Sequence, residues 1–203
     1  FKQCALETVC LPASVDSIGE YAFQNCTALK SVELPAGLKA LSRYVFNGCT
    51  SLGSIVLPDG LETIGYSAFS NCTAMTSITM GDKIKSVGDG AFVNCEALAD
   101  VCYKGSLSGW MRIDMLADTY PEETCPLSFA SRLYVDYGTD DQQIVTDLVV
   151  PEDITAVKDY AFAGYKGLTS AVFPAHVKEI GREAFSYCTQ LAQAEIHAQR
   201  IGG

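Results

Sequence analysis

The nine cysteines of this sequence are the residues that could take part in the most kinds of chemistry. Five of them occupy one position of a repeating pattern. The five are Cys26, Cys49, Cys72, Cys95 and Cys188, with Tyr165 at the same position of a further copy. A thiolate can act as a nucleophile, bind zinc or form a disulfide. Neighbours in a stacked column would lie roughly 5 Å apart, which permits a disulfide, but their side chains would point the same way and could not surround a zinc ion. We therefore expect buried free thiols that act as small apolar residues.

The other potentially reactive residues form no clear catalytic set. Cys102 and Cys125 could form a disulfide across an irregular stretch, although a free pair is the favoured alternative, and the cysteine count leaves the redox compartment open. A Cys–His nucleophile pair needs hydrogen-bond contact. Because Cys188 belongs to the repeated column and His176 follows a turn proline, we expect His176 and His197 to be surface residues.

Two adjacent carboxylates, Asp140 and Asp141, lie in a stretch rich in turn residues. Solvation is the favoured interpretation of this pair, and a weak calcium site is the alternative. Neither a nucleophile with a base nor a set of metal ligands is evident. The sequence therefore predicts a protein that is not an enzyme, with no cofactor and no metal.

The positions of these residues are set by a 23-residue repeat. Its copies are residues 11–33, 34–56, 57–79, 80–102, 150–172 and 173–195, with partial repeats at both ends. Residues 103–149 are an irregular long repeat or insertion, which we expect to protrude from the array or bend it. A fixed period of this length predicts a solenoid in which each turn packs on its neighbours, so we interpret residues 1–203 as one elongated domain.

Each copy has the same internal order of signals. Residues 29–34 are apolar at the first, fourth and sixth places, which predicts an inward-facing parallel strand, and Pro35 ends it. A segment centred on phenylalanine, such as Phe46, follows and is expected to form one helical turn against the core. That turn is expected to end in a left-handed residue, because asparagine and glycine alternate there. Tyr187 is the exception to this rule.

The irregular stretch contains three predicted elements. Residues 106–117 resemble a short amphipathic helix, whose apolar side would carry Trp110, Met111, Ile113 and Met115. Residues 133–137 alternate as a strand does, and residues 138–142 are typical of a turn. Residues 145–151 rejoin the regular pattern.

The overall composition narrows the class of partner. The chain has 48% hydrophobic residues and a formal net charge of −10, with lysine and arginine scattered along it. An acidic chain without basic clusters is a poor partner for nucleic acid or for an anionic membrane surface. No apolar run reaches the roughly 18–20 residues that a membrane-spanning helix needs.

The predicted strands leave two side chains per repeat on their outer side, and we expect a partner to bind there because these residues are not needed for the core. The candidates are Ser31, Glu33, Ser54, Val56, Ser77, Thr79, Asp100, Ser170, Val172 and Gln193. Specific recognition should come from what differs between turns, so we expect the edge of the irregular stretch, including Asp140 and Asp141, to form a binding surface with Asp100 and Val172. Two alternatives remain open, namely that Trp110 fills a gap in the core rather than binding, and that the array is a passive spacer.

The motif Leu-Pro-x-x-Leu/Val-x-x-Ile-Gly-x-x-Ala-Phe-x-Asn-Cys, best seen in residues 11–33 and 57–79, resembles the BspA-like leucine-rich repeat family of bacterial cell-surface proteins. The resemblance implies a leucine-rich repeat solenoid, a right-handed coil with a parallel β-sheet on one face and short strands or helical turns on the other. It also implies an extracellular, cell-surface, non-enzymatic role in adhesion or in binding a protein, such as a host surface or matrix protein. A structural stalk without a ligand is the alternative, since the motif residues belong to the core.

Overall fold

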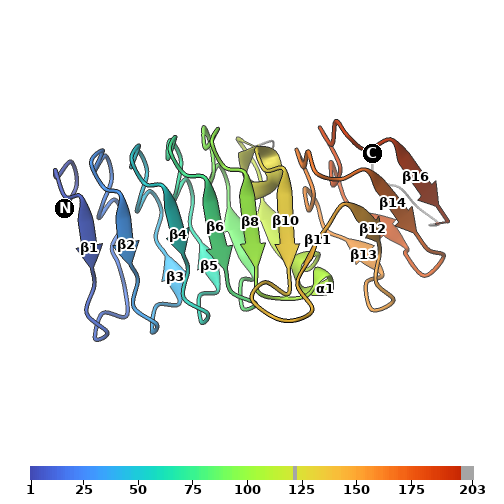
Figure 1. Ribbon diagram of the computed structural model, residues 1–203, viewed down its shortest axis with the longest axis horizontal. Coiled ribbons are helices and arrows are strands. Elements are labelled where there is room, and N and C mark those ends of the chain that lie inside the picture. Colours follow the sequence, from blue (N-terminus) through green and yellow to red (C-terminus); the bar gives the residue numbers. More distant parts are fainter. Residues whose placement is uncertain (121–122, 198–203) are drawn as a thin grey trace.

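The computed structural model describes residues 1–120 and 123–197. The chain winds into a parallel β-solenoid of about eight turns with little helix. Each turn contributes a strand to a main face, which points toward the viewer in Figure 1, and most turns contribute a shorter strand to a second face behind it. The predicted repeat solenoid is therefore confirmed.

Within the described residues, the main face consists of ten short strands. They are β1 (Thr8–Cys10), β2 (Ser31–Glu33), β4 (Ser54–Val56), β6 (Ser77–Met80), β8 (Asp100–Tyr103), β10 (Arg132–Val135), β11 (Gln143–Ile144), β12 (Asp147–Val149), β14 (Ser170–Phe173) and β16 (Gln193–Ile196). Ser54 is paired with Ser77, and Ser77 with Asp100, so the register advances by one 23-residue repeat per strand. Among the strand pairs of residues 1–120 and 123–197, only β11 and β10 are antiparallel.

The second face is built from strands of two or three residues. They are β3 (Ala40–Leu41), β5 (Thr63–Ile64), β7 (Ser86–Gly88), β9 (Asp114–Leu116), β13 (Ala156–Val157) and β15 (Glu179–Ile180). Two short helices complete the described elements, α1 (Leu107–Trp110) and the 3-10 helix η2 (Pro126–Ser128). The core lies between the two faces.

Stacked phenylalanines and cysteines fill this core. The rings of Phe23, Phe46 and Phe69 are stacked with centroids 5.4 and 5.7 Å apart, and all three rings are buried. The thiol of Cys72 donates a hydrogen bond to the carbonyl oxygen of Phe46 at 3.2 Å, and the thiol of Cys49 does the same to Phe23. The repeated thiols therefore tie consecutive turns together in addition to filling space.

All nine cysteines lie within the described residues and are free, as the sequence predicts for the repeated column. The disulfide considered between Cys102 and Cys125 is wrong. Cys102 takes an outer position on β8, in register with Thr79 and Tyr134, whereas the Cys125 thiol lies 3.9 Å from the carbonyl oxygen of Ala161 in the core.

The phenylalanine segments are runs of hydrogen-bonded turns rather than single helical turns. Left-handed residues occur where the sequence predicts them, for example at Asn25 (φ 57°) and Gly48 (φ 75°), and Tyr187 (φ 56°) follows the same geometry. A second left-handed residue precedes each phenylalanine by two places, as at Tyr44 (φ 57°). A helical turn cannot contain that residue, because αL geometry reverses the local hand of the chain.

The irregular stretch belongs to the solenoid and does not protrude as an insertion. Of the predicted helix over residues 106–117, residues 107–110 form α1, whereas residues 114–116 pair with β7 as strand β9. Trp110, Met111, Ile113 and Met115 are all buried, as the sequence predicts. Trp110 fills the core, which confirms the interpretation that it fills a gap rather than binding a partner.

Both faces are interrupted at the same level, after β9 on the second face and after β11 on the main face. Buried polar contacts connect the two halves there. The Trp110 Nε1–H donates to the Ala161 carbonyl oxygen at 2.9 Å. The Tyr165 hydroxyl accepts from the Leu133 N–H at 2.9 Å and donates to the Val145 carbonyl oxygen at 2.7 Å. Tyr165, which stands where the other copies of the repeat have cysteine, therefore fills the space at the interruption.

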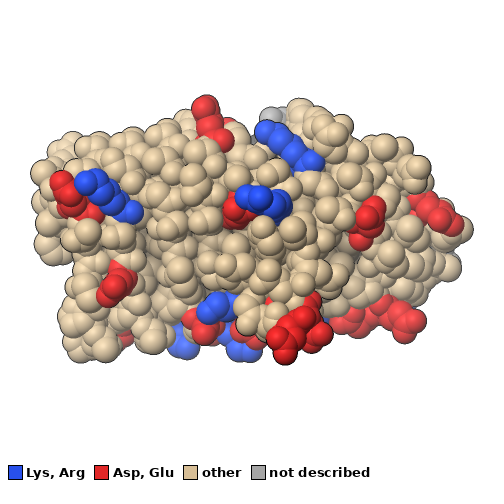
Figure 2. All heavy atoms as spheres, viewed as in Figure 1, with Lys and Arg blue, Asp and Glu red and all other residues tan. Residues whose placement is uncertain are grey.

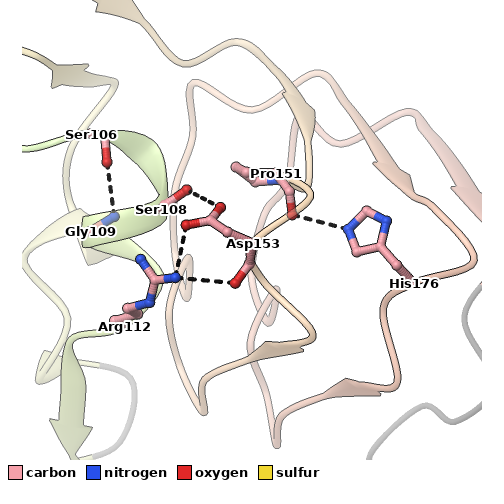
Figure 3. A network of polar contacts seen from close by, with 7 residues as sticks. All are labelled: Ser106, Ser108, Gly109, Arg112, Pro151, Asp153 and His176. Carbon is pink, nitrogen blue, oxygen red and sulfur yellow. Dashed lines mark hydrogen bonds and ion pairs between the residues drawn. The ribbon is translucent and has the colours of Figure 1, made fainter.

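Contacts on the surface connect the same two halves. In Figure 3, the side chains of Ser108, in α1, and of Arg112, just after it, point toward Asp153. Their distances to the Asp153 carboxylate are 2.7 and 2.8 Å. The ring Nε2 of His176 lies 3.0 Å from the carbonyl oxygen of Pro151 in the adjoining turn. His176 is thus half-buried with a backbone partner, whereas His197 is exposed, as predicted.

Candidate functional site

The outer side of the main face carries the predicted binding residues in two parallel columns. Ser54, Ser77 and Asp100 are neighbours in one column, and Val56 and Thr79 are neighbours in the other. The middle residue of each strand points inward, so β2 and β4 both have an exposed–buried–exposed pattern. Ser31 and Glu33 occupy the equivalent places on β2, and Ser170, Val172 and Gln193 those on β14 and β16.

Charge is sparse on this side of the molecule. Figure 2 shows it mostly without charged side chains, and basic and acidic side chains lie side by side at several places on it. Charged side chains of both signs gather along the lower edge of the view, and acidic ones dominate its right-hand part. A face of this kind suits a partner that is recognised by hydrogen bonds and shape rather than by net charge.

The structure does not place Asp100 and Val172 next to each other, and the surface predicted from them and the edge of the irregular stretch stays a prediction. Asp100 lies on β8 in a five-stranded sheet, whereas Val172 lies on β14 in a separate three-stranded sheet. Strands β10, β11 and β12 lie between them (Figure 1). These strands lie in the main face because the irregular stretch forms part of the solenoid.

A polar hollow of about 330 Å³ marks the place where the irregular stretch meets the regular sheet. Its lining comes from β6, β8, β10 and the turn that joins β10 to β11. The lining residues are Ser77, Thr79, Asp100, Cys102, Tyr134, Tyr137 and Gln142. Three of the predicted residues therefore meet four that the prediction did not select.

Asp100, which lines the hollow, forms an ion pair with Arg132 beside it. Arg132 is the register partner of Asp100, and its guanidinium contacts both carboxylate oxygens, with Nη2 at 2.8 Å from Oδ2. The Arg132 side chain is 49% exposed and that of Asp100 is 26% exposed. Bidentate pairing fixes the guanidinium plane, so the remaining N–H donors keep a defined direction toward solvent.

Two tyrosines also line the hollow. The rings of Tyr134 and Tyr137 meet edge to face, with centroids 5.8 Å apart. The Tyr137 backbone N–H donates to the Tyr103 carbonyl oxygen at 3.0 Å, which anchors the turn against the end of β8. Both rings are half-buried, so they offer rigid aromatic surface at little further cost in entropy.

The acid–base state of the hollow follows from its neighbours. The adjacent Cys102 raises the pKa of the Tyr137 hydroxyl, while burial raises the pKa of the Cys102 thiol. Both groups are therefore neutral near neutral pH, and Arg132 balances Asp100. The hollow presents neutral hydrogen-bonding groups with aromatic walls, and it holds no nucleophile activated by a base.

Asp140 and Asp141 lie at the exposed tip of the β10–β11 turn and do not line the hollow. The Asp141 N–H donates to the Thr139 hydroxyl at 3.2 Å, so part of the turn closes on itself. Among residues 1–120 and 123–197, no group of three or more histidine, cysteine or carboxylate side chains is placed to hold a metal ion. Within the same ranges no helix has the length and apolar character needed to span a bilayer.

The sequence contains a signal for the residues that the prediction missed. Arg132 and Tyr134 flank Leu133, which takes the inward place of a strand, so both fall in the outer columns. Tyr137 and Gln142 belong to the turn, and their approach to Cys102 depends on the antiparallel return of β11, which has no counterpart in the regular repeats.

The repeat pattern matches a family model described as a BspA type leucine rich repeat region, in six copies over residues 1–110 and 141–202. Among solved structures, the chain is similar to the pneumococcal vaccine antigen PcpA, with a TM-score of 0.56 and 18% identity over 94% of this chain and 50% of that one. It is also similar to a leucine-rich repeat protein of T. pallidum (TM-score 0.49, 22% identity, 97% of this chain and 72% of that one). A third similar structure is a leucine-rich repeat protein of Bacteroides ovatus (TM-score 0.48, 20% identity, 100% and 76%). No curated protein matches the chain.

Proposed function

Because the chain belongs to the BspA-type leucine-rich repeat family, we propose that it is a non-catalytic protein-binding module, displayed on a bacterial cell surface, that recognises a protein through the hollow at β8 and β10. The observation that carries the proposal is the concentration of two tyrosines and an arginine on an outer face that otherwise bears mostly small side chains. Tyrosine and arginine are enriched among the residues that dominate binding energy in protein interfaces.

The composition of the hollow defines the kind of partner. A neutral lining with a fixed guanidinium and free hydroxyl groups favours a polar loop that offers backbone carbonyl groups and an apolar side chain to the tyrosine rings. Host surface or matrix proteins displayed outside the cell are the proposed class. The serine-rich outer residues of β4 and β6 would surround this centre with weaker contacts.

The outer residues of β2 and β4 favour a second function, a passive spacer. Ser31, Ser54 and Val56 offer little aromatic or charged surface, and that part of the sheet is poorly suited to anchor a partner. A spacer would present another part of a longer protein at a distance from the cell. The two functions differ in whether any substitution on the outer face affects binding.

The test measures binding of the purified chain to a panel of extracellular-matrix and cell-surface proteins by biolayer interferometry. Arg132→Ala and Tyr134→Ala should each weaken binding to the bound protein by about tenfold or more, as central interface residues do. Matched controls are Arg43→Ala, which removes an exposed arginine paired with Glu20, and Tyr120→Ala, which removes a tyrosine that is 41% exposed outside the hollow. Equal losses in variants and controls, or no loss in any variant, would refute the assignment of the site. A panel without any bound protein would favour the spacer.

A further inference from the structure

The second face is open between β9 and β13. Strands β3, β5, β7 and β9 form one parallel sheet, and β13 and β15 form another, so β9 and β13 are edge strands that lie on either side of the interruption. A hollow of about 420 Å³ separates them, lined on one side by Asp114–Leu116 and on the other by residues 156–159. Among the described residues, no backbone hydrogen bond joins β9 to β13.

The interruption follows from the irregular stretch. The turn that contains β10 adds a strand to the main face, but it returns through β11 to β12 without placing a strand on the second face. At this level the main face therefore has a strand, β10, without a counterpart on the second face. The buried contact between Trp110 and Ala161 and the surface contacts of Asp153 hold the two halves at this spacing (Figure 3).

Unused backbone groups face the open interval. The Asp114 N–H donates to the Lys85 carbonyl oxygen, so alternation along the strand directs the Met115 N–H away from β7 and toward β13. On the other side, the Val157 carbonyl oxygen accepts from the Gly181 N–H in the direction of β15. By the same alternation, the N–H and C=O of Ala156 point toward β9. Open edges of this kind are templates for an added strand.

The side chains at the interval favour a basic occupant. Lys158 reaches across to Asp114, with Nζ at 2.7 Å from Oδ1, and both side chains are about half exposed. Asp159 and Glu179 add two carboxylates to the lining, and neither forms an ion pair with a lysine or arginine among the described residues. The lining thus has three carboxylates against one ammonium group. Leu116, which is 55% exposed, offers an apolar contact beside them.

We propose that the interval between β9 and β13 is a docking site for an extended, basic peptide segment of a partner protein, which joins the second face as an added strand. The N–H of Met115 and the N–H and C=O of Ala156 provide the hydrogen bonds, as in other cases of strand addition to a sheet edge, while the Met115 carbonyl oxygen stays bonded to the Ala117 N–H. A lysine or arginine of the segment takes the place of Lys158 at Asp114 or pairs with Glu179. This site lies on the opposite face from the hollow at β8 and β10, so the two bind independently.

The test uses a defined probe, the N-acetylated and C-amidated peptide Thr-Val-Lys-Val-Thr. Two relatives of the probe serve as controls, one with alternate backbone nitrogens methylated and one with glutamate in place of lysine. Titration of the isotope-labelled chain followed by NMR reports on individual amides. We expect the parent peptide to shift the Met115 and Ala156 amides and to slow their hydrogen exchange by about tenfold at saturation. Both control peptides should bind at least about tenfold more weakly.

Substitutions in the chain separate strand addition from general attraction. Lys158→Ala removes the competitor at Asp114 and should tighten binding of the parent peptide several-fold, a gain that loss of structure cannot produce. Glu179→Lys should weaken binding by about tenfold, whereas Glu96→Lys, the same change at an exposed glutamate away from the interval, should leave it unchanged. The proposal is overturned if the parent peptide does not bind at about 5 mM, a concentration at which even weak strand addition would be detected. It is equally overturned if the methylated peptide binds as well as the parent or if Lys158→Ala does not tighten binding.

Discussion

Replacement of Tyr165 by phenylalanine tests how the two halves of the solenoid are joined. The buried hydroxyl satisfies two backbone groups that have no partner in a sheet, the N–H of Leu133 at 2.9 Å and the C=O of Val145 at 2.7 Å. A buried polar group left without a partner costs about 1–3 kcal/mol, and a typical hydrogen bond contributes about 1 kcal/mol net. Because the ring itself is retained, no large cavity forms. Tyr165→Phe should therefore lower the free energy of unfolding by about 2–4 kcal/mol.

Thermal unfolding and amide hydrogen exchange together provide the assay. For a chain of this size, about 2–4 kcal/mol corresponds to a fall in Tm of roughly 4–16 °C. The Leu133 amide should exchange faster in the variant, because it loses its acceptor. Tyr120→Phe is the matched control and should change stability by less than about 0.5 kcal/mol, since its side chain is 41% exposed. A Tyr165→Phe variant that melts with the parent protein and keeps its protected Leu133 amide would refute the role given to the hydroxyl.

Three further predictions concern the core, the thiols and acid stability. Phe69→Ala should cost roughly 3–5 kcal/mol in chemical denaturation, whereas Ser54→Ala on the outer face should stay within about 0.5 kcal/mol, and equal costs would contradict the assignment of inside and outside. Burial raises the pKa of Cys49 to about 12. When the native protein is treated with an alkylating reagent near pH 8, mass spectrometry should find Cys49 unmodified and the exposed Cys10 labelled. Fast labelling of Cys49 would contradict the stacked core. Burial of Asp89 opposes ionisation, but hydrogen bonds from the backbone N–H groups of residues 118–120 outweigh it and lower the pKa of the carboxyl group. The ionised Asp89 carboxylate contributes to stability above its unfolded pKa of about 3.9, and this contribution is lost as the pH falls through the lower folded pKa. An Asp89→Asn variant should therefore lose stability less steeply than the parent protein below about pH 4 when both are titrated with acid. Parallel curves would contradict this.

The regular turns are predictable because every one of them repeats the same local signals. The alternation in Ser31-Val32-Glu33, followed by Leu34 and Pro35, gives the strand, its inward side and its end. The asparagine or glycine after each phenylalanine gives the left-handed exit. The left-handed residue two places before the phenylalanine was missed, since tyrosine at Tyr44 carries no local preference for that conformation. It is held by hydrogen bonds to the next turn, such as that from the Tyr44 N–H to the Tyr66 carbonyl oxygen at 2.9 Å.

The irregular stretch was harder to predict because local patterns there fit two structures. Met111, Ile113 and Met115 alternate with exposed residues, which suits strand β9, yet the cluster around Trp110 also suits a helix. Pairing with β7 decides between them, and that pairing depends on residues far away in the sequence. The hollow at β8 and β10 was only half predicted for the same reason. Asp100 follows from the repeat, whereas Tyr137 reaches the hollow through a turn whose course depends on the return of β11.

The two candidate binding surfaces have one structural cause. Regular turns place nearly identical side chains at each level, and their core positions cannot change without a cost in packing. The stretch from Tyr103 to Val149 adds strand β10 to the main face without a counterpart on the second face. On the main face this brings Arg132 and Tyr134 into columns that elsewhere carry mostly small side chains. On the second face it leaves two strand edges unpaired. The side chains and strand edges that a partner could recognise therefore lie where the repeat is interrupted. The buried contacts of Trp110 and Tyr165 keep the core continuous across that interruption.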